Sequence, residues 1–257
     1  MVCASALFCF SWIVYGQDIT LDKSLKDYKL PSNVEEYFQN KYKNQIEKVE
    51  CRLEETPQGP KGYLQVKGHI LLKNNNHVTG DGESRIRSIA QSFLADEARV
   101  LGLADLREWH ETDIRYLPKS KNGSYDAHIS YLRYIQDLRF ASGAYGPALS
   151  LTIGKDDIIY ALTAYLAPAP SEVYKAANNK FISKENAENI IRRDMQEQGI
   201  GSLKIKHLSL FATDTYPYVE WGAYCTDGRY VSWNYTVNAT TGAIHRKNKS
   251  RRNDPGC

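Results

Sequence analysis

Three stretches of the chain space their apolar residues three or four positions apart, which is the period of an amphipathic helix. The first stretch is residues 33–49. The second lies between Gly82 and Gly102, and the third begins at Ser183, a favoured N-cap residue, and stops at Gly199. The pattern therefore predicts three helices.

Segments rich in β-branched and aromatic residues occupy much of the remaining chain and predict strands. They are residues 63–72, 113–117, 125–139, 148–153, 158–166, 204–211, 218–225, 230–238 and 243–245. The proline-rich residues 167–171 are typical of a stiff linker. A helix followed by antiparallel strands is an α+β arrangement, so we expect two such units. Each sheet would pack one face on its helix and leave the other face to water or a partner.

The amino terminus has the pattern of an export signal. Residues 2–14 form an uncharged apolar run, and charged residues begin at Asp18. Such a run suits the core of a signal peptide and is short for a membrane span. We expect a signal peptide at residues 1–16, a mature chain that starts near Gln17, and a secreted protein, extracellular or periplasmic. The alternative is a buried amino-terminal strand.

Composition narrows the class of protein. Hydrophobic residues make up 42% of the chain and charged residues 25%, which excludes a wholly disordered chain. A net charge of +3 gives no argument for nucleic acid as a partner. No apolar run reaches the roughly 18 residues that a membrane-spanning helix needs, so we expect no membrane span.

Export would favour disulfides and glycans. Three cysteines remain after the signal, which allows one disulfide and one free thiol without fixing the pair. The candidate disulfide joins Cys51 and Cys225, and Cys257 is the candidate free thiol. Four asparagines fit the glycan acceptor pattern: Asn122, Asn234, Asn238 and Asn248.

The sequence lacks the motifs of common catalytic sites. A zinc protease needs two histidines around a glutamate in the pattern H-E-x-x-H. His110 and Glu111 begin that pattern, but Ile114 stands where the second histidine should be. No nucleophile elbow and no phosphate-binding loop occurs. We therefore expect no enzyme activity, no catalytic residue, no metal and no cofactor.

Aromatic residues crowd the last predicted strands and suggest a contact surface, because tyrosine and tryptophan anchor protein interfaces. The candidate partner-binding residues are Tyr145, Tyr218, Trp221, Tyr230, Trp233 and Tyr235. The alternative is that half of them pack on the third helix. The basic residues that follow suggest a contact with an anionic surface, a dibasic processing site or a solvated tail.

Local residues and their order resemble a known pair of domains. Residues 87–94, 101–103, 134–136 and 149–151 resemble the fungalysin/thermolysin propeptide domain, abbreviated FTP. Residues 183–187, together with 237–244, look like a PepSY domain. The two stretches cover about residues 80–246. The chain departs from the family at residues 141–146, where a Gly-Ile-Pro-Val-Phe-Gly-like run is usual.

The resemblance implies two cystatin-like units, each a helix packed on an antiparallel sheet. Together with the local patterns above, it divides the chain into a signal peptide (1–16), an amino-terminal helical segment (17–60), an FTP-like domain (61–168), a linker (169–180), a PepSY-like domain (181–246) and a basic tail (247–257).

In secreted metalloproteases these domains form the pro-region, which assists folding of the catalytic domain and inhibits it. We therefore expect a secreted, non-catalytic protein that binds and inhibits, or helps to fold, a secreted metalloprotease or another exported enzyme. One alternative is an exported structural or ligand-binding module with an aromatic sheet surface. The other is the leading fragment of a longer metalloprotease precursor.

Overall fold

The computed structural model describes residues 34–56, 59–72, 82–103, 105–117, 127–142, 146–154, 156–228 and 231–251. The expected signal peptide lies outside these residues. Among the described helices, none is long and apolar enough to cross a membrane.

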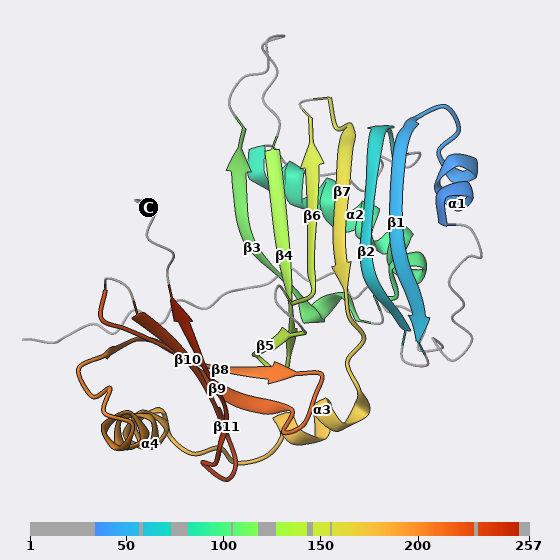
Figure 1. Ribbon diagram of the computed structural model, residues 1–257. Coiled ribbons are helices and arrows are strands. Elements are labelled where there is room, and N and C mark those ends of the chain that lie inside the picture. The colour runs from blue at the N-terminus through green and yellow to red at the C-terminus, as the bar shows by residue number, and fades with distance from the viewer. Residues whose placement is uncertain are drawn as a thin grey trace, which may run out of the picture.

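One hydrogen-bonded sheet of eleven strands runs through the described part of the chain (Figure 1). Its order is β1-β2-β7-β6-β4-β5-β8-β9-β10-β11, and β3 also pairs with β4. The strands are β1 (Ile46–Thr56), β2 (Gly59–Ile70), β3 (Trp109–Tyr116), β4 (Ala127–Ile135), β5 (Leu138–Ala141), β6 (Ala148–Ile153), β7 (Ile159–Leu166), β8 (Lys204–Thr213), β9 (Val219–Thr226), β10 (Val231–Asn238) and β11 (Ile244–Arg251).

The expected fold of two separate cystatin-like units is wrong. Strands hold 48% of the described residues and helices 28%, so the sheet dominates. The short strand β5 joins what would have been two sheets, because it pairs with the end of β4 on one side and with β8 on the other. The pairing of β5 with β8 is parallel, which makes the sheet mixed instead of antiparallel.

The predicted strand 125–139 breaks into two strands at a tight hairpin. Gln136 and Asp137 both have positive φ angles, 50° and 67°. Two central residues with positive φ form the turn whose twist suits adjacent antiparallel strands. The turn reverses the chain, so that Tyr134 lies opposite Arg139.

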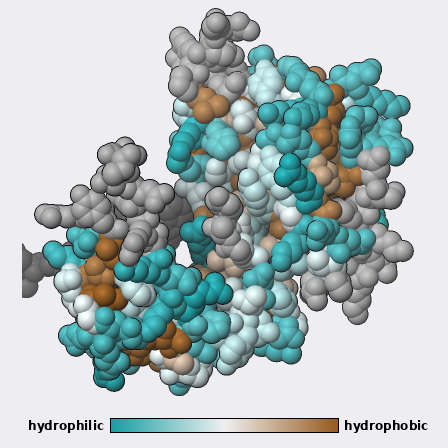
Figure 2. All heavy atoms as spheres, in the orientation of Figure 1, coloured by the Kyte–Doolittle hydropathy of each residue, from teal (hydrophilic) through white to brown (hydrophobic). Residues whose placement is uncertain are grey.

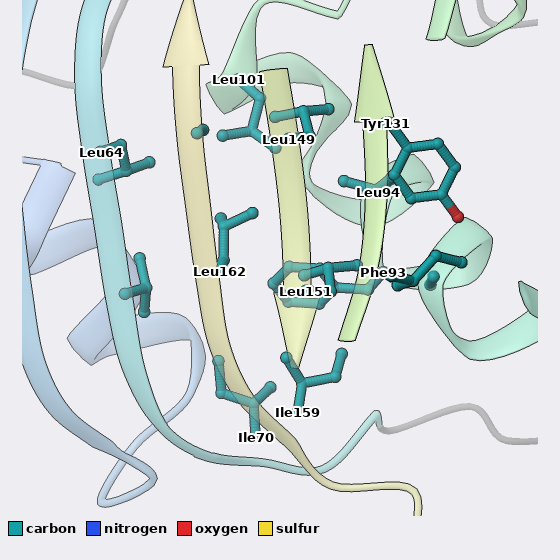
Figure 3. Packing of buried hydrophobic residues seen from close by; sticks show 14 of the residues in the cluster. Leu64, Ile70, Phe93, Leu94, Leu101, Tyr131, Leu149, Leu151, Ile159 and Leu162 are labelled. Atoms are coloured by element: carbon teal, nitrogen blue, oxygen red, sulfur yellow. The ribbon is translucent and has the colours of Figure 1, made fainter. Parts of the chain in front are cut away.

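Helix α2 (Gly82–Leu101) covers one face of the amino-terminal strands and builds the larger core. Figure 3 shows leucine and isoleucine side chains of β2, β6 and β7 gathered with Phe93 and Leu94 of α2. Burying a side chain of this size contributes about 1.5–3 kcal/mol. The helix ends as predicted, since Gly102 has a φ of +62° and Leu103 N donates to Ala98 O at 2.8 Å.

Helix α1 (Val34–Lys41) is shorter than the predicted helix 33–49. Asn44 has a φ of 59°, a left-handed conformation that ends helices, and the chain then enters β1. A buried carboxylate, Glu97 of α2, fixes the end of α1. It accepts a hydrogen bond from Tyr42 Oη at 2.5 Å and pairs with Lys41 Nζ at 2.6 Å.

Helix α4 (Lys184–Glu197) covers one face of the carboxy-terminal strands. Its N-cap is Ser183, as predicted, whose hydroxyl accepts from Asn186 N at 3.1 Å. The expected basic tail is partly wrong, because the last strand β11 continues to Arg251 and pairs along β10.

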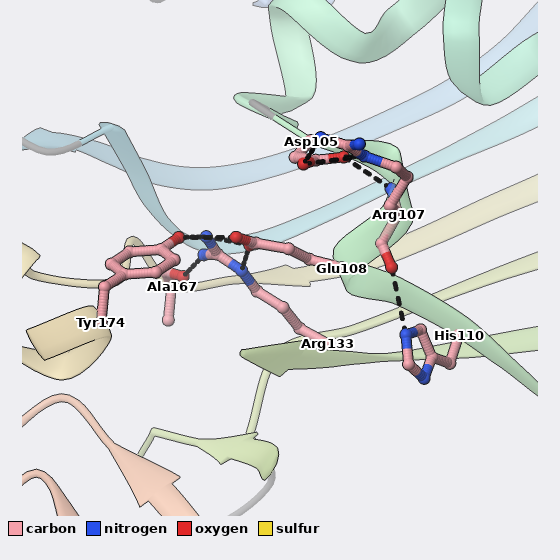
Figure 4. A network of polar contacts seen from close by, with 7 residues as sticks. All are labelled: Asp105, Arg107, Glu108, His110, Arg133, Ala167 and Tyr174. Atoms are coloured by element: carbon pink, nitrogen blue, oxygen red, sulfur yellow. Dashed lines mark hydrogen bonds and ion pairs between the residues drawn. The ribbon is translucent and has the colours of Figure 1, made fainter. Parts of the chain in front are cut away.

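The expected linker contains helix α3 (Ser171–Ala177), and a polar network fixes it to the sheet (Figure 4). Arg133 of β4 pairs with Glu108 at 2.7 Å and donates to Ala167 O at 2.8 Å and to Tyr174 Oη at 3.1 Å. Tyr174 Oη donates in turn to Glu108 Oε1 at 2.8 Å. Glu108 closes the 3-10 turn η3 (Leu106–Glu108), so the network ties β4, η3, the linker and α3 together.

Candidate binding surfaces

The amino-terminal strands have one face packed on α2 and a second face that we call the outer face. Alternate residues of β4, such as Ile129, are buried toward α2, and the residues between them are half-buried on the outer face. In Figure 1, α2 lies behind these strands and the outer face points to the viewer. Figure 2 shows surface of intermediate hydropathy over the middle strands, bordered by hydrophilic residues and, on the right of the view, by a hydrophobic strip.

The register aligns the side chains of the outer face in rows that cross six strands. The central row, which we call the hydroxyl row, holds Glu50, Gln65, Thr163, Ser150, Ser130 and Asp113. Gln65 Nε2 donates to Thr163 Oγ1 at 3.4 Å. The row therefore presents hydroxyls and an amide in its middle and a carboxylate at each end.

On one side of the hydroxyl row lies an aromatic row. Its members are Arg52, Tyr63, Tyr165, Ala148, Leu132 and His110. The rings of Tyr63 and Tyr165 have centroids 5.0 Å apart, and Tyr165 is 43% exposed. At the other end of the row, the His110 ring stacks on Tyr134 at 4.5 Å.

On the other side lies a basic row. Its members are Lys48, Lys67, Ala161, Thr152, His128 and Arg115. Two of its cations form ion pairs with the ends of the hydroxyl row, Lys48 with Glu50 and Arg115 with Asp113. Partial burial, aided by the nearby Arg115, lowers the pKa of His128 below its ordinary value, so its ring is neutral at pH 7.

A second surface lies on the carboxy-terminal strands, on an exposed loop that leads into β9. The Tyr216 ring lies edge-on to Tyr218 at 6.1 Å and to His245 at 6.4 Å. His245 Nδ1 lies 2.7 Å from Glu220 Oε1. We call these four residues the tyrosine–histidine cluster. Tyr216 is 68% exposed, so the cluster presents an aromatic ring to solvent.

The cluster adjoins β11, which ends the sheet order of the described strands. An edge strand offers backbone N–H and C=O groups on its outer side. Arg246 and Lys249 of β11 are exposed, and Lys247 pairs with Asp194 of α4 at 3.0 Å. The edge is therefore basic.

The structure separates the predicted aromatic contact residues. Trp221 and Tyr235 belong to the core under α4 and are wrong as contact residues. Trp221 Nε1 donates to Ile182 O at 3.1 Å, and Tyr235 Oη donates to Asp194 Oδ2 at 3.0 Å. Trp233 is half-buried, and no hydrogen-bond partner for its Nε1 is found among the described residues. Tyr218 belongs to the tyrosine–histidine cluster, while Tyr145 and Tyr230 lie outside the described residues.

The predicted disulfide is not formed. Cys51 is an exposed residue of β1 and Cys225 a buried residue of β9, and both thiols are free. Burial raises the pKa of the Cys225 thiol to about 11. Cys257 lies outside the described residues.

Two of the four candidate glycan acceptors are exposed, Asn234 of β10 and Asn248 of β11, which lie opposite each other. Asn238 is buried and wrong as an acceptor, because its Oδ1 accepts from the backbone N–H groups of Thr240 and Thr241. Asn122 lies outside the described residues.

The incomplete zinc motif has a structural role at His110. Its Nε2 lies 3.0 Å from Arg107 O, and Glu111 pairs with Arg87 of α2 at 2.8 Å. Within the described ranges, no group of three or more His, Cys, Asp or Glu side chains is placed to hold a metal ion.

Sequence reasoning missed the rows of the outer face and the exposure of Tyr216. The alternation in β4 showed which of its residues share a face. The rows depend on the pairing of six strands, and no local pattern records that pairing.

Comparison with known proteins adds little to this picture. No family model matches the chain, and no curated protein matches it. One solved structure, a "putative lipoprotein" from Clostridium difficile 630, shares 14% sequence identity, with 69% of this chain and 100% of that chain covered. Its TM-score of 0.25 is too low to show a shared fold.

Proposed function

We propose that this protein is an exported, non-catalytic binding protein that holds a protein partner at the tyrosine–histidine cluster and β11. The observation that carries the proposal is the 68% exposed ring of Tyr216, which lies edge-on to both Tyr218 and His245. Tyrosine is enriched among the residues that dominate protein interfaces. A ring whose neighbours already restrict it loses little conformational freedom on binding.

Strand β11 supports the proposal and indicates the chemistry of the partner. An extended segment can bind to the open side of an edge strand through backbone hydrogen bonds. Arg246 and Lys249 lie on opposite faces of β11, because they oppose Thr236 and Trp233 in the register. Opposite charges on neighbouring strands stabilise the pair, so a segment with acidic residues on both faces fits this edge.

The resemblance to FTP and PepSY domains narrows the proposed partner to a secreted metalloprotease, which the protein would inhibit or help to fold. The test uses purified residues 17–257, titrated against a thermolysin-like protease and the secreted metalloproteases of the host while hydrolysis of a peptide is followed. We expect stoichiometric inhibition that fades as the chain is cleaved. If the proteases cleave the chain without being inhibited, or neither cleave it nor are inhibited by it, a metalloprotease partner is contradicted.

A matched pair of variants tests the surface itself. Tyr216→Ser removes the exposed ring of the cluster, and Tyr116→Ser removes a ring of β3 that is 53% exposed. Loss of an interface anchor costs about 2 kcal/mol or more, so we expect inhibition by Tyr216→Ser to weaken about 30-fold. Tyr116→Ser should inhibit like the unmodified chain. Equal inhibition by all three proteins would show that the cluster is not the contact surface.

A further inference from the structure

The outer face of the amino-terminal strands has a chemistry unlike that of the proposed protein contact. The middle of the three rows is built by β4, β6 and β7, and His128 is neutral at pH 7, so these strands present no charged side chain there. The residues of β6 and β7 in the rows are Ala148, Ser150, Thr152, Ala161, Thr163 and Tyr165. Most are small, so the surface is flat and rich in hydroxyls.

This composition fits a hydroxylated ligand better than a protein. Serine and alanine are depleted in protein interfaces, whose cores use large aromatic and apolar side chains. The hydroxyls of Ser130, Ser150 and Thr163 can each donate and accept a hydrogen bond. A ligand with donors and acceptors along its length can pair with such a row. With strands ~4.8 Å apart, six strands span about 24 Å, which is room for several sugar rings.

An aromatic platform lies next to the hydroxyl row. The rings of Tyr63 and Tyr165 are 5.0 Å apart on neighbouring strands, and Tyr165 is 43% exposed. Tyrosine combines an apolar ring with a polar tip. Such a ring can pack against the C–H groups of a pyranose while the sugar hydroxyls reach the adjacent row.

Charge selects the type of polymer. The carboxylates at the two ends of the hydroxyl row, Glu50 and Asp113, are paired with the adjacent cations Lys48 and Arg115. The other Lys and Arg residues of the three rows, Arg52 and Lys67, belong to β1 and β2, so β4, β6 and β7 offer no cation to an anionic polymer. A neutral polymer needs no opposite charge on these strands.

We propose that the outer face binds a neutral polysaccharide, with sugar rings packed on Tyr63 and Tyr165 and hydroxyls bonded to the hydroxyl row. This site is separate from the tyrosine–histidine cluster and does not depend on the protein partner proposed above. Affinity electrophoresis of residues 17–257 through gels that contain xyloglucan, galactomannan, laminarin or dextran tests it, with polygalacturonate as the anionic comparison.

We expect at least one neutral polymer to retard the chain, with a dissociation constant that 0.5 M NaCl leaves unchanged. Tyr165→Ala should weaken that binding about tenfold or more, and Tyr165→Phe should retain most of it because the ring remains. Tyr216→Ser should bind like the unmodified chain, which separates this site from the proposed protein contact. Equal thermal unfolding of the variants checks that each is folded.

Three results would overturn the proposal. The first is no retardation by any neutral polymer. The second is retardation by polygalacturonate alone that salt abolishes, which would mean non-specific attraction to cations. The third is retardation that Tyr165→Ala does not change, which would place the contact elsewhere on the chain.

Discussion

Arg133 ties the amino-terminal strands to α3, and its replacement gives the sharpest test of how the sheet is held together. Its side chain is 10% exposed, and that of its ion-pair partner Glu108 is 16% exposed. Arg133→Ala removes the ion pair at 2.7 Å and the hydrogen bonds to Ala167 O and Tyr174 Oη. Glu108 would keep one neutral donor, Tyr174, in a site shielded from water.

The burial of the pair sets the expected magnitude. Removing one partner of a buried ion pair costs about 3–5 kcal/mol, because the other charge stays desolvated and uncompensated. The matched control is Arg107, which pairs with Asp105 and is drawn beside the Arg133 network in Figure 4. It is also ion-paired, at 2.7 Å, but its side chain is 89% exposed. Exposed pairs contribute about 0–1 kcal/mol, so Arg107→Ala should change stability little.

The assay is urea unfolding followed by tryptophan fluorescence, with the free energy of unfolding taken by linear extrapolation. We expect Arg133→Ala to lose at least about 2 kcal/mol more than Arg107→Ala. The double variant Arg133→Met/Glu108→Leu should recover part of the loss, since it leaves no unpaired charge. Two single variants within about 0.5 kcal/mol of each other would refute the reasoning, because burial would then not decide the cost.

Three further predictions concern buried or half-buried groups. A thiol reagent at pH 8 should label Cys51 in the folded chain and spare Cys225, whose pKa burial raises to about 11; equal rates by peptide mapping would contradict this. Burial lowers the pKa of His128, so the unfolded chain takes up the proton first as pH falls below about 6.5. The free energy of unfolding should therefore decrease as the pH falls from about 6.5 to the lower pKa of His128 in the folded chain. In His128→Gln, the urea concentration at the unfolding midpoint should change less between pH 7.5 and 5. If the midpoints of the two proteins depend on pH in the same way, this effect of His128 is excluded. Tyr42→Phe should cost about 1–3 kcal/mol in the same unfolding assay, because buried Glu97 loses a donor; unchanged stability would show that the bond contributes nothing net.

Two helices were predictable from sequence because strong local signals mark their ends. Gly102 and Gly199 have φ angles of +62° and +70°, a conformation that glycine adopts without steric cost. In both helices the backbone closes in the same way, with Leu103 N bonded to Ala98 O and Ile200 N bonded to Met195 O, each at 2.8 Å. A local residue preference was therefore enough to place these ends.

The errors arose where residues other than glycine adopt the left-handed conformation. Asn44 ends α1 early, and Gln136 and Asp137 turn the chain between β4 and β5. Residues of these types visit that region only occasionally, so their presence does not predict a turn. The parallel pairing of β5 with β8 joins residues some 70 positions apart, such as Phe140 and Ala212. No local pattern contains that information.

The candidate contact residues show a similar limit. Alternation along a strand indicates which residues share a face but not which face a helix covers. Tyr235 and Thr236 are neighbours in β10, and only the position of α4 decides that Tyr235 is the core residue. Tyr216 lies in the loop before β9. The alternation of a strand does not apply in a loop, so it could not predict whether this side chain is exposed. Its exposure became clear only from the fold.

The continuity of the sheet bears on how the two proposed surfaces relate. The outer face belongs to β1, β2, β3, β4, β6 and β7, and the tyrosine–histidine cluster lies beside the strands from β8 to β11. Of the strands that the structure describes, only β5 lies between them, and the few backbone hydrogen bonds of its four residues are a weak connection by themselves. The network of Arg133 and the packing of Val173 beside Phe140 reinforce it. The side chains at this junction, more than the backbone of β5, would therefore fix the distance between the two surfaces. A polymer bound to one surface and a protein bound to the other would be held at that distance.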